Sequence, residues 1–134
     1  MKVLIVDDVK GWRDYNSSIV KSMFAGVNQG VNQGVNIDTA ESAREGYDKV
    51  LENNTQPYDI ILTDLQMESD FEPLYAGEWL VERIKEMKNY YKTKIVIISA
   101  TYNIDIIADK YSVDYIRKST ARSFPDSYDF LKST

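Results

Sequence analysis

The chain has 134 residues, of which 43% are hydrophobic and 28% are charged, and its net charge is −5. This length predicts one domain with its own core, and the composition is typical of a soluble globular protein rather than a disordered or membrane-embedded one. The sequence contains no Cys and no His, so thiolate sites, disulfides and histidine catalysis are excluded, while carboxylates remain as ligands for hard cations such as Mg²⁺. The acidic charge argues against a nucleic-acid partner.

Five short apolar segments alternate with amphipathic segments along the chain. Continuous apolar segments predict strands buried on both faces, and these lie at residues 2–6, 35–38, 59–64, 94–99 and 114–118. Apolar side chains at helical spacing predict helices, and these lie at residues 10–24, 40–51, 76–90 and 104–111 and from residue 123 onward. Strict alternation of this kind predicts an α/β fold, with a parallel sheet covered by helices on both faces.

Local motifs support several of these boundaries. Asp38 and Glu41 resemble a capping box before the second helix, and Leu51 is expected on the inward face of that helix. Asn103 is expected to cap the fourth helix, and the Ser-Phe-Pro segment at 123–125 predicts the start of the last one. The apolar segment at the amino terminus is too short for a signal peptide and no segment is long enough to span a membrane, so we expect a cytoplasmic protein.

Two polar segments predict loops. Residues 26–34 repeat the unit Val-Asn-Gln-Gly, which predicts an extended surface loop, since so short a repeat cannot build a solenoid. Residues 68–76 carry Glu68, Asp70 and Glu72 and predict a solvated acidic loop. Because this loop follows the central strand, the alternative is that its acids recruit a second cation or repel some phosphodonors.

Polar side chains follow the predicted strands at the points where these end. Parallel strands end at one edge of the sheet, and ligands of such folds bind at that edge, near the point where strand order reverses. The residues placed there are Asp7, Asp8, Asp64, Ser99, Thr101 and Lys118. Three carboxylates gathered at one edge repel one another, so without a cation we expect a raised pKa for at least one of them.

This set of residues resembles the receiver domain of two-component response regulators, the CheY-like family. The matching residues are the acidic pair in Val6-Asp7-Asp8, Asp64 after Ile61-Leu62-Thr63, Ser99-Ala100 after Ile97-Ile98, and the lysine of Tyr115-Ile116-Arg117-Lys118. The resemblance spans nearly the whole chain. It implies a single receiver domain over residues 1–134, with a doubly wound, flavodoxin-like (βα)5 sheet in the strand order 2-1-3-4-5.

The resemblance also implies a phosphorelay function. Asp64 would accept a phosphoryl group from the phosphohistidine of a sensor kinase or phosphotransfer protein. Mg²⁺ would be held by Asp7, Asp8, Asp64 and the backbone carbonyl of Gln66. Gln66 and Thr101 would tune the loss of the phosphoryl group, and the chain would catalyse no reaction besides its own phosphorylation and dephosphorylation.

The phosphoryl group would be bound by Ser99, Ala100 and Lys118. Ser99 would also act as a switch together with Tyr115, three residues before the lysine. A downstream protein would bind the face formed by the fourth helix, the fifth strand and the fifth helix. Lys118 is followed by Ser119, where the family usually has a proline.

Other interpretations share parts of this pattern. A lone strand-end Asp is more often a helix cap, and it is the joint placement of the residues that favours a receiver. The main alternative keeps the fold but drops the chemistry, as a receiver-like docking module that works without phosphorylation. A Mg²⁺-dependent phosphatase with an Asp nucleophile would need a second acid where Gln66 stands, and a flavin or nucleotide binder would need a Gly-rich turn after the first strand.

Overall fold

The structure is a computed structural model that describes residues 1–25, 34–67 and 75–134. Its centre is a parallel sheet of five strands in the order β2-β1-β3-β4-β5. The strands are β1 (Lys2–Val6), β2 (Asn36–Ala40), β3 (Ile60–Thr63), β4 (Lys94–Ser99) and β5 (Asp114–Arg117). Both the fold class and the strand order are therefore confirmed.

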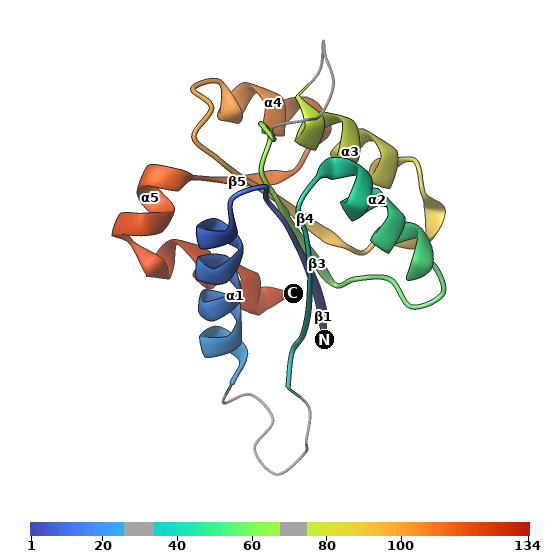
Figure 1. Cartoon of the computed structure of the whole chain (residues 1–134), viewed down its shortest axis with the longest axis horizontal. Coiled ribbons are helices and arrows are strands. Elements are labelled where there is room, and N and C mark those ends of the chain that lie inside the picture. The colour runs from blue at the N-terminus through green and yellow to red at the C-terminus, as the bar shows by residue number, and fades with distance from the viewer. Residues whose placement is uncertain (26–33, 68–74) are drawn as a thin grey trace.

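Helices cover both faces of the sheet (Figure 1). The α-helices are α1 (Lys10–Phe24), α2 (Ala43–Glu52), α3 (Ala76–Lys85), α4 (Ile104–Tyr111) and α5 (Lys118–Ser123). Two 3₁₀ segments complete the described elements, η1 (Lys88–Tyr90) and η2 (Pro125–Ser133). α1, α5 and η2 pack on one face, and α2, α3 and α4 pack on the other.

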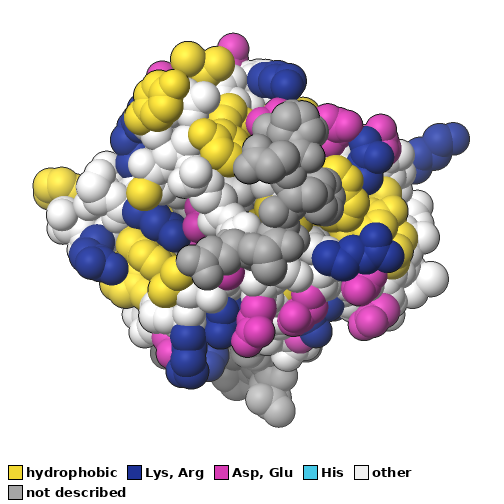
Figure 2. Space-filling view, turned by 45° about the horizontal axis from the view of Figure 1, so that its top comes forward, with side chains coloured by type: hydrophobic (Ala, Val, Ile, Leu, Met, Phe, Trp, Pro, Cys, Tyr) yellow, Lys and Arg dark blue, Asp and Glu magenta, His cyan; other side chains and the backbone are white. Residues whose placement is uncertain are grey.

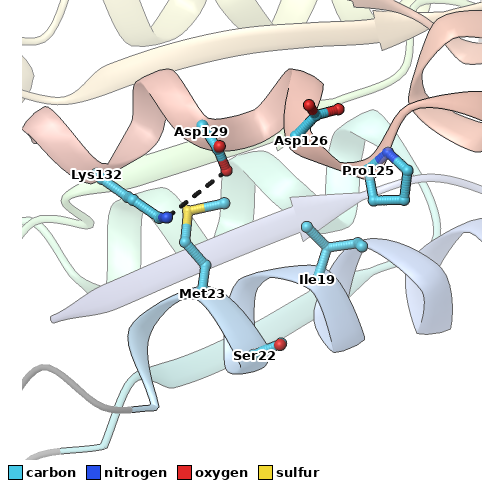
Figure 3. Close-up of a pocket in the computed structure, with 7 residues that line it drawn as sticks. All are labelled: Ile19, Ser22, Met23, Pro125, Asp126, Asp129 and Lys132. Atoms are coloured by element: carbon cyan, nitrogen blue, oxygen red, sulfur yellow. Dashed lines mark ion pairs between the residues drawn. The ribbon is translucent and has the colours of Figure 1, made fainter.

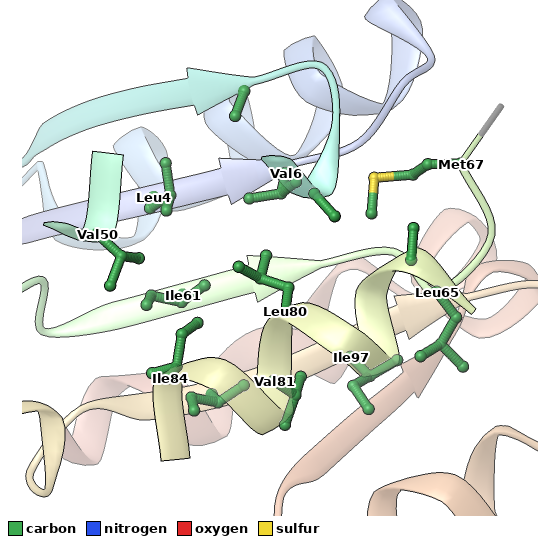
Figure 4. Packing of buried hydrophobic residues seen from close by; sticks show 14 of the residues in the cluster. Leu4, Val6, Val50, Ile61, Leu65, Met67, Leu80, Val81, Ile84 and Ile97 are labelled. Carbon is green, nitrogen blue, oxygen red and sulfur yellow. The ribbon is translucent and has the colours of Figure 1, made fainter. Parts of the chain in front are cut away.

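The strands are apolar on both sides because each side faces a separate core. Leu4 and Val6 of β1 belong to the core under α2, α3 and α4, whereas Val3 and Ile5 belong to the core under α1 and η2. Figure 4 shows the first core, where the sheet meets Leu80 and other side chains of α3. Each fully buried side chain of this size contributes about 1.5–3 kcal/mol to stability.

The second strand and the helix after it differ from the prediction. β2 runs from Asn36 to Ala40 rather than over 35–38, so Asp38 lies within the strand and accepts a hydrogen bond from the Tyr58 hydroxyl at 2.6 Å. The expected capping box of Asp38 and Glu41 is therefore wrong. The N-cap is Ser42, whose hydroxyl accepts from the Glu45 N–H at 3.1 Å. Leu51, expected inward, is 47% exposed.

The third helix is shorter than its apolar pattern predicted. α3 ends at Lys85 instead of Tyr90, because the next amides donate three residues back, Glu86 to Arg83 and Met87 to Ile84. η1 then turns the Tyr90 ring into the core, where its hydroxyl donates to the Val50 carbonyl at 2.8 Å. A tertiary contact thus overrides the helical periodicity.

The last helix begins earlier in the chain than predicted. β5 ends at Arg117, so Lys118 is the first residue of α5 rather than the last of the strand, and a helix start at 123 is wrong. The apolar stripe of the last segment is nevertheless confirmed, since Tyr128 and Leu131 of η2 are fully buried.

The remaining predictions concern a cap, two loops and the membrane. Asn103 is the N-cap residue of α4, as predicted, but its buried side-chain oxygen accepts no hydrogen bond from any described residue. The predictions for the two polar loops fall on 26–33 and 68–74, which lie outside the described residues. Within the described ranges, no helix combines the length and the apolar character needed to cross a membrane.

Candidate functional site

The ends of β1 and β3 bring two acids to one edge of the sheet. The strands pair in parallel with Val6 opposite Thr63, so the next residues, Asp7 and Asp64, stand at the same level. Backbone hydrogen bonds fix both positions, because the Asp64 N–H donates to the Val6 carbonyl at 2.9 Å and the Asp7 N–H donates to the Ala40 carbonyl at 3.1 Å. Figure 2 looks onto this end of the molecule, where acidic and basic side chains lie close together.

Three carboxylates form a cluster at this edge. Each of Asp7, Asp8 and Asp64 offers an oxygen, and these oxygens lie within 4.8 Å of one another. Asp7 is 1% exposed and Asp64 is 6% exposed, whereas Asp8 is half-buried. Because all of these ligand atoms are carboxylate oxygens, the cluster fits a hard divalent cation.

Lys118 lies against the two buried acids. Its ammonium is 3.0 Å from Oδ2 of Asp7 and 2.9 Å from Oδ2 of Asp64, and the lysine side chain is only 12% exposed. The Oδ1 atom of each acid is held by backbone, since the Val9 N–H donates to Asp7 at 2.9 Å and the Leu65 N–H donates to Asp64 at 2.7 Å. Lys118 therefore bridges two acids whose orientations are fixed by backbone N–H groups just after β1 and β3.

Two groups at this site, the Asp7 carboxyl and the Lys118 ammonium, have pKa values that depart from their ordinary ranges. Burial raises the pKa of the Asp7 carboxyl, and the charge of Asp64 adds to this, although the Val9 N–H and Lys118 act against it. The expectation of one raised carboxyl pKa is met, with burial as the larger cause and repulsion between acids as a smaller one. Burial lowers the pKa of the Lys118 ammonium, but the hydrogen bonds and charges of Asp64 and Asp7 outweigh burial and leave the pKa raised.

A glycine lets α3 approach the acid at the end of β3. A Cβ atom added to Gly77 would lie 1.8 Å from the Asp64 carbonyl oxygen and 2.8 Å from the Leu65 Cα. The Gly77 N–H donates to the Leu65 carbonyl at 2.9 Å. The start of α3 is therefore packed directly on the backbone that carries Asp64.

The other residues predicted for the site lie at the ends of β4 and β5 or beside the cluster. Ser99 is fully buried at the end of β4, where its hydroxyl forms a 2.9 Å hydrogen bond with that of Thr101, also buried. Ala100 between them is exposed, as is Gln66 beside Asp64. Tyr115 on β5 is 41% exposed, with its ring 5.8 Å from the Arg117 guanidinium.

Three further residues contact either the clustered acids or Lys118 and were not predicted from the sequence. Arg13 donates to the Asp7 carbonyl at 2.9 Å, Trp12 places its ring 4.9 Å from the Lys118 ammonium, and Gly77 packs on Asp64. From the sequence, Trp12 can be identified only as one residue of the apolar stripe of its helix. Neither Arg13 nor Gly77 carries a sequence signal for this role, because both contacts are tertiary.

A separate groove lies beside the carboxyl-terminal part of α1. It encloses about 330 Å³ between α1 and η2 (Figure 3), and its lining residues are Ile19, Ser22, Met23, Pro125, Asp126, Asp129 and Lys132. Lys132 and Asp129 in this groove form an ion pair at 3.7 Å. Since it contains none of the clustered acids, the groove is distinct from the candidate site.

The chain has no match among protein-family models and none among curated proteins, but its fold matches several solved structures. These include the chemotaxis response regulator CheY4 of Vibrio cholerae, at 20% identity over 87% of this chain and 85% of that chain, with a TM-score of 0.66. The phosphorylated cyanobacterial phytochrome response regulator RcpA matches at 21% identity over 98% and 89%, with a TM-score of 0.68. The Mn²⁺-bound form of response regulator Rcp1 matches at 18% identity over 98% and 89%, with a TM-score of 0.64. The chain therefore has the fold of the CheY-like receiver domains of response regulators.

Proposed function

We propose that this chain is a response-regulator receiver of the cytoplasm, which accepts a phosphoryl group on Asp64 and changes conformation in response. The observation that carries the proposal is the cluster of Asp7, Asp8 and Asp64, with oxygens within 4.8 Å, bridged at two of its members by the Lys118 ammonium. Phosphoryl transfer needs mainly positioning and charge neutralisation, and this cluster offers both. The chain would catalyse only its own phosphorylation and dephosphorylation.

Mg²⁺ is the proposed ion of this site. The all-oxygen donor set fits a hard cation, and Rcp1, a response regulator with the same fold, has been solved in a Mn²⁺-bound form. Asp7, Asp8, Asp64 and the backbone carbonyl of Gln66 would hold the ion. Bound there, Mg²⁺ would neutralise phosphoryl oxygens during transfer.

The residues of the chain would act on the phosphoryl group in distinct ways. An oxygen of Asp64 would form the new P–O bond while the P–N bond of the donor phosphohistidine breaks. Lys118 already lies 2.9 Å from Asp64 and would bind one phosphoryl oxygen. Ser99 would donate its hydroxyl to another oxygen, and the backbone N–H of Ala100 would donate to a third.

The conformational change would begin at the hydroxyl pair of Ser99 and Thr101. A phosphoryl group on Asp64 would draw the Ser99 hydroxyl away from Thr101, its partner at 2.9 Å in the present structure. Tyr115, half-exposed on β5, would then turn inward and alter the face formed by α4, β5 and α5. A downstream protein is the proposed partner of this face, and Gln66 and Thr101 would set how long the phosphoryl group persists.

Intact-mass measurement after incubation with Mg²⁺ and a small-molecule phosphodonor tests this function. The parent protein should gain the mass of one phosphoryl group, and Asp64→Asn should gain none. Asp48→Asn is the matched control, since Asp48 is a half-exposed acid on the surface of α2 and should leave the adduct unchanged. No adduct on the parent would favour the phosphorylation-independent docking module instead.

A further inference from the structure

Trp12 lies in the first turn of α1 and holds two cations of α5 against its ring. The Lys118 ammonium is 4.9 Å from the ring centroid, and the Arg122 guanidinium is 5.0 Å from it. Lys118 and Arg122 are four residues apart and so lie on one side of their helix. That side of α5 therefore packs against Trp12.

Tyr15 attaches the same two helices to each other. Its ring meets that of Trp12 edge-on, with the centroids 5.5 Å apart and the planes at 81°. Its hydroxyl donates to the carbonyl of Ala121, a fully buried residue of α5, at 2.7 Å. The indole of Trp12 is thus fixed on one side by Tyr15, while α5 is fixed in place by the same tyrosine.

This arrangement restricts a side chain that is otherwise flexible. A lysine has four rotatable carbon bonds and a point charge, so its ammonium takes a defined position only where its surroundings impose one. Asp7 and Asp64 attract the Lys118 ammonium from one side, and the electron-rich face of Trp12 attracts it as well. Lys118 is the first residue of α5, so the position of its ammonium at the end of the flexible side chain depends on these contacts.

We propose that Trp12 is a positioning residue that aims the Lys118 ammonium at the phosphoryl group on Asp64. The proposal rests on the proposed function of the site. Trp12 does not touch the reacting atoms, since it acts through Lys118. The chemistry it provides is a cation–π contact, which an aliphatic side chain of similar bulk cannot replace.

The test compares phosphorylation rates of Trp12→Leu and Trp12→Phe with the parent, under Mg²⁺ and a small-molecule phosphodonor. Loss of a cation–π contact corresponds to about 2- to 30-fold in an equilibrium or rate constant. We expect Trp12→Leu to be slower by a factor in this range and Trp12→Phe to recover most of the rate. Tyr91→Leu is the control, because it removes an exposed Lys92–Tyr91 cation–π pair before β4, at the other end of the sheet.

A double-mutant cycle separates positioning from general stability. In the Lys118→Met background, Trp12→Leu should cause no further loss of rate, because the cation it positions is gone. Equal losses in both backgrounds, or equal losses for Trp12→Leu and Trp12→Phe, would overturn the proposal. Thermal melts of each variant, followed by circular dichroism, identify any that have lost their fold.

A second measurement keeps the inference separate from the proposed function. A parent protein that accepts no phosphoryl group would refute the receiver chemistry, whereas the contact itself is tested by ¹⁵N NMR of the Lys118 side-chain ammonium. We expect slow exchange of its protons with water in the parent and in Trp12→Phe, and fast exchange in Trp12→Leu. Fast exchange in the parent would refute the positioning role.

Discussion

Gly77→Ala is the substitution whose effect the structure defines most directly. The new Cβ would meet the Asp64 carbonyl oxygen at 1.8 Å, and this distance must open to at least 3.0 Å. The atoms in the way belong to the backbone, so no side chain can rotate aside. Either α3 moves outward or the end of β3 moves, and either movement disturbs the Asp64 carboxylate.

The expected size of the effect follows from two opposing terms. Overpacking of a rigid site costs about 1–3 kcal/mol, and we take the upper end because the clash is with backbone. Alanine is favoured over glycine in a helix by about 1 kcal/mol. We therefore expect Gly77→Ala to lower the free energy of unfolding by about 2 kcal/mol. With a urea m-value of about 2 kcal/mol/M, this lowers the denaturation midpoint by about 1 M.

Gly11→Ala supplies the matched control for this measurement. Gly11 also lies in the first turn of a helix, but a Cβ added there meets nothing within 4 Å. Urea denaturation should show Gly11→Ala to be at least as stable as the parent, by up to about 1 kcal/mol. In the phosphodonor assay Gly77→Ala should also react more slowly, since a displacement near 1 Å can cost about 100-fold in rate. Equal midpoints for the two variants would refute the packing argument.

Three further predictions concern the charges around the site and the buried acid of α3. Mg²⁺ at 100 times its Kd should raise the free energy of unfolding by about 2.7 kcal/mol in the parent. Asp64→Asn should stabilise the metal-free protein by relieving repulsion between the carboxylates. The same variant should lose most of the stabilisation that Mg²⁺ gives the parent. A parent melting temperature that does not change with Mg²⁺ would contradict the metal site. Lys118→Met should destabilise the metal-free protein by about 3 kcal/mol, since it leaves buried acids without their counter-charge. Because folding raises the lysine pKa, its contribution is fully present below pH 10.5 and is lost as pH rises through the folded-state pKa, so urea midpoints of parent and variant should converge above pH 10.5. Tyr111→Phe should cost about 1.5–3 kcal/mol in urea denaturation, because the Tyr111 hydroxyl donates at 2.6 Å to the buried Glu78 carboxylate, while the exposed control Tyr91→Phe should cost nothing measurable.

The fold could be predicted from the sequence where a segment has a single hydrophobic periodicity and is followed by residues that end the strand or helix. β1 at 2–6 and α1 at 10–24 match their predicted ranges to the residue, because apolar strand, acidic pair and amphipathic helix follow one another without ambiguity. The end of α3 was not predictable in this way. Met87 and Tyr91 continue the helical stripe in sequence. The hydrogen bond from Tyr90 to the Val50 carbonyl nevertheless fixes the chain in a 3₁₀ turn, and no local sequence pattern predicts that contact.

The residues of the candidate site likewise include some that could be predicted from the sequence and some that could not. Asp7, Asp8 and Asp64 could be placed together because parallel strands end at one edge, which is a property of the fold class and needs no side-chain detail. The position of Lys118 in the first turn of α5 could not be inferred, since a strand-end lysine and a helix-start lysine have the same local sequence. The contact with Trp12 depends on how α1 packs against α5, and this is decided only in three dimensions.

The balance of charge at the cluster indicates how chemistry on Asp64 could reach the rest of the fold. Three ionised carboxylates and one ammonium leave two negative charges, which one divalent cation compensates. A phosphoryl group of about −2 on Asp64, as proposed, would replace the single charge of that side chain, so Lys118 would gain a stronger partner there than it has in Asp7. We expect the ammonium to move toward the phosphoryl oxygens and to weaken its 3.0 Å contact with Asp7. Because Lys118 is the first residue of α5, a shift of its side chain would act directly on a helix of the α4–β5–α5 face, which is proposed to bind a downstream protein.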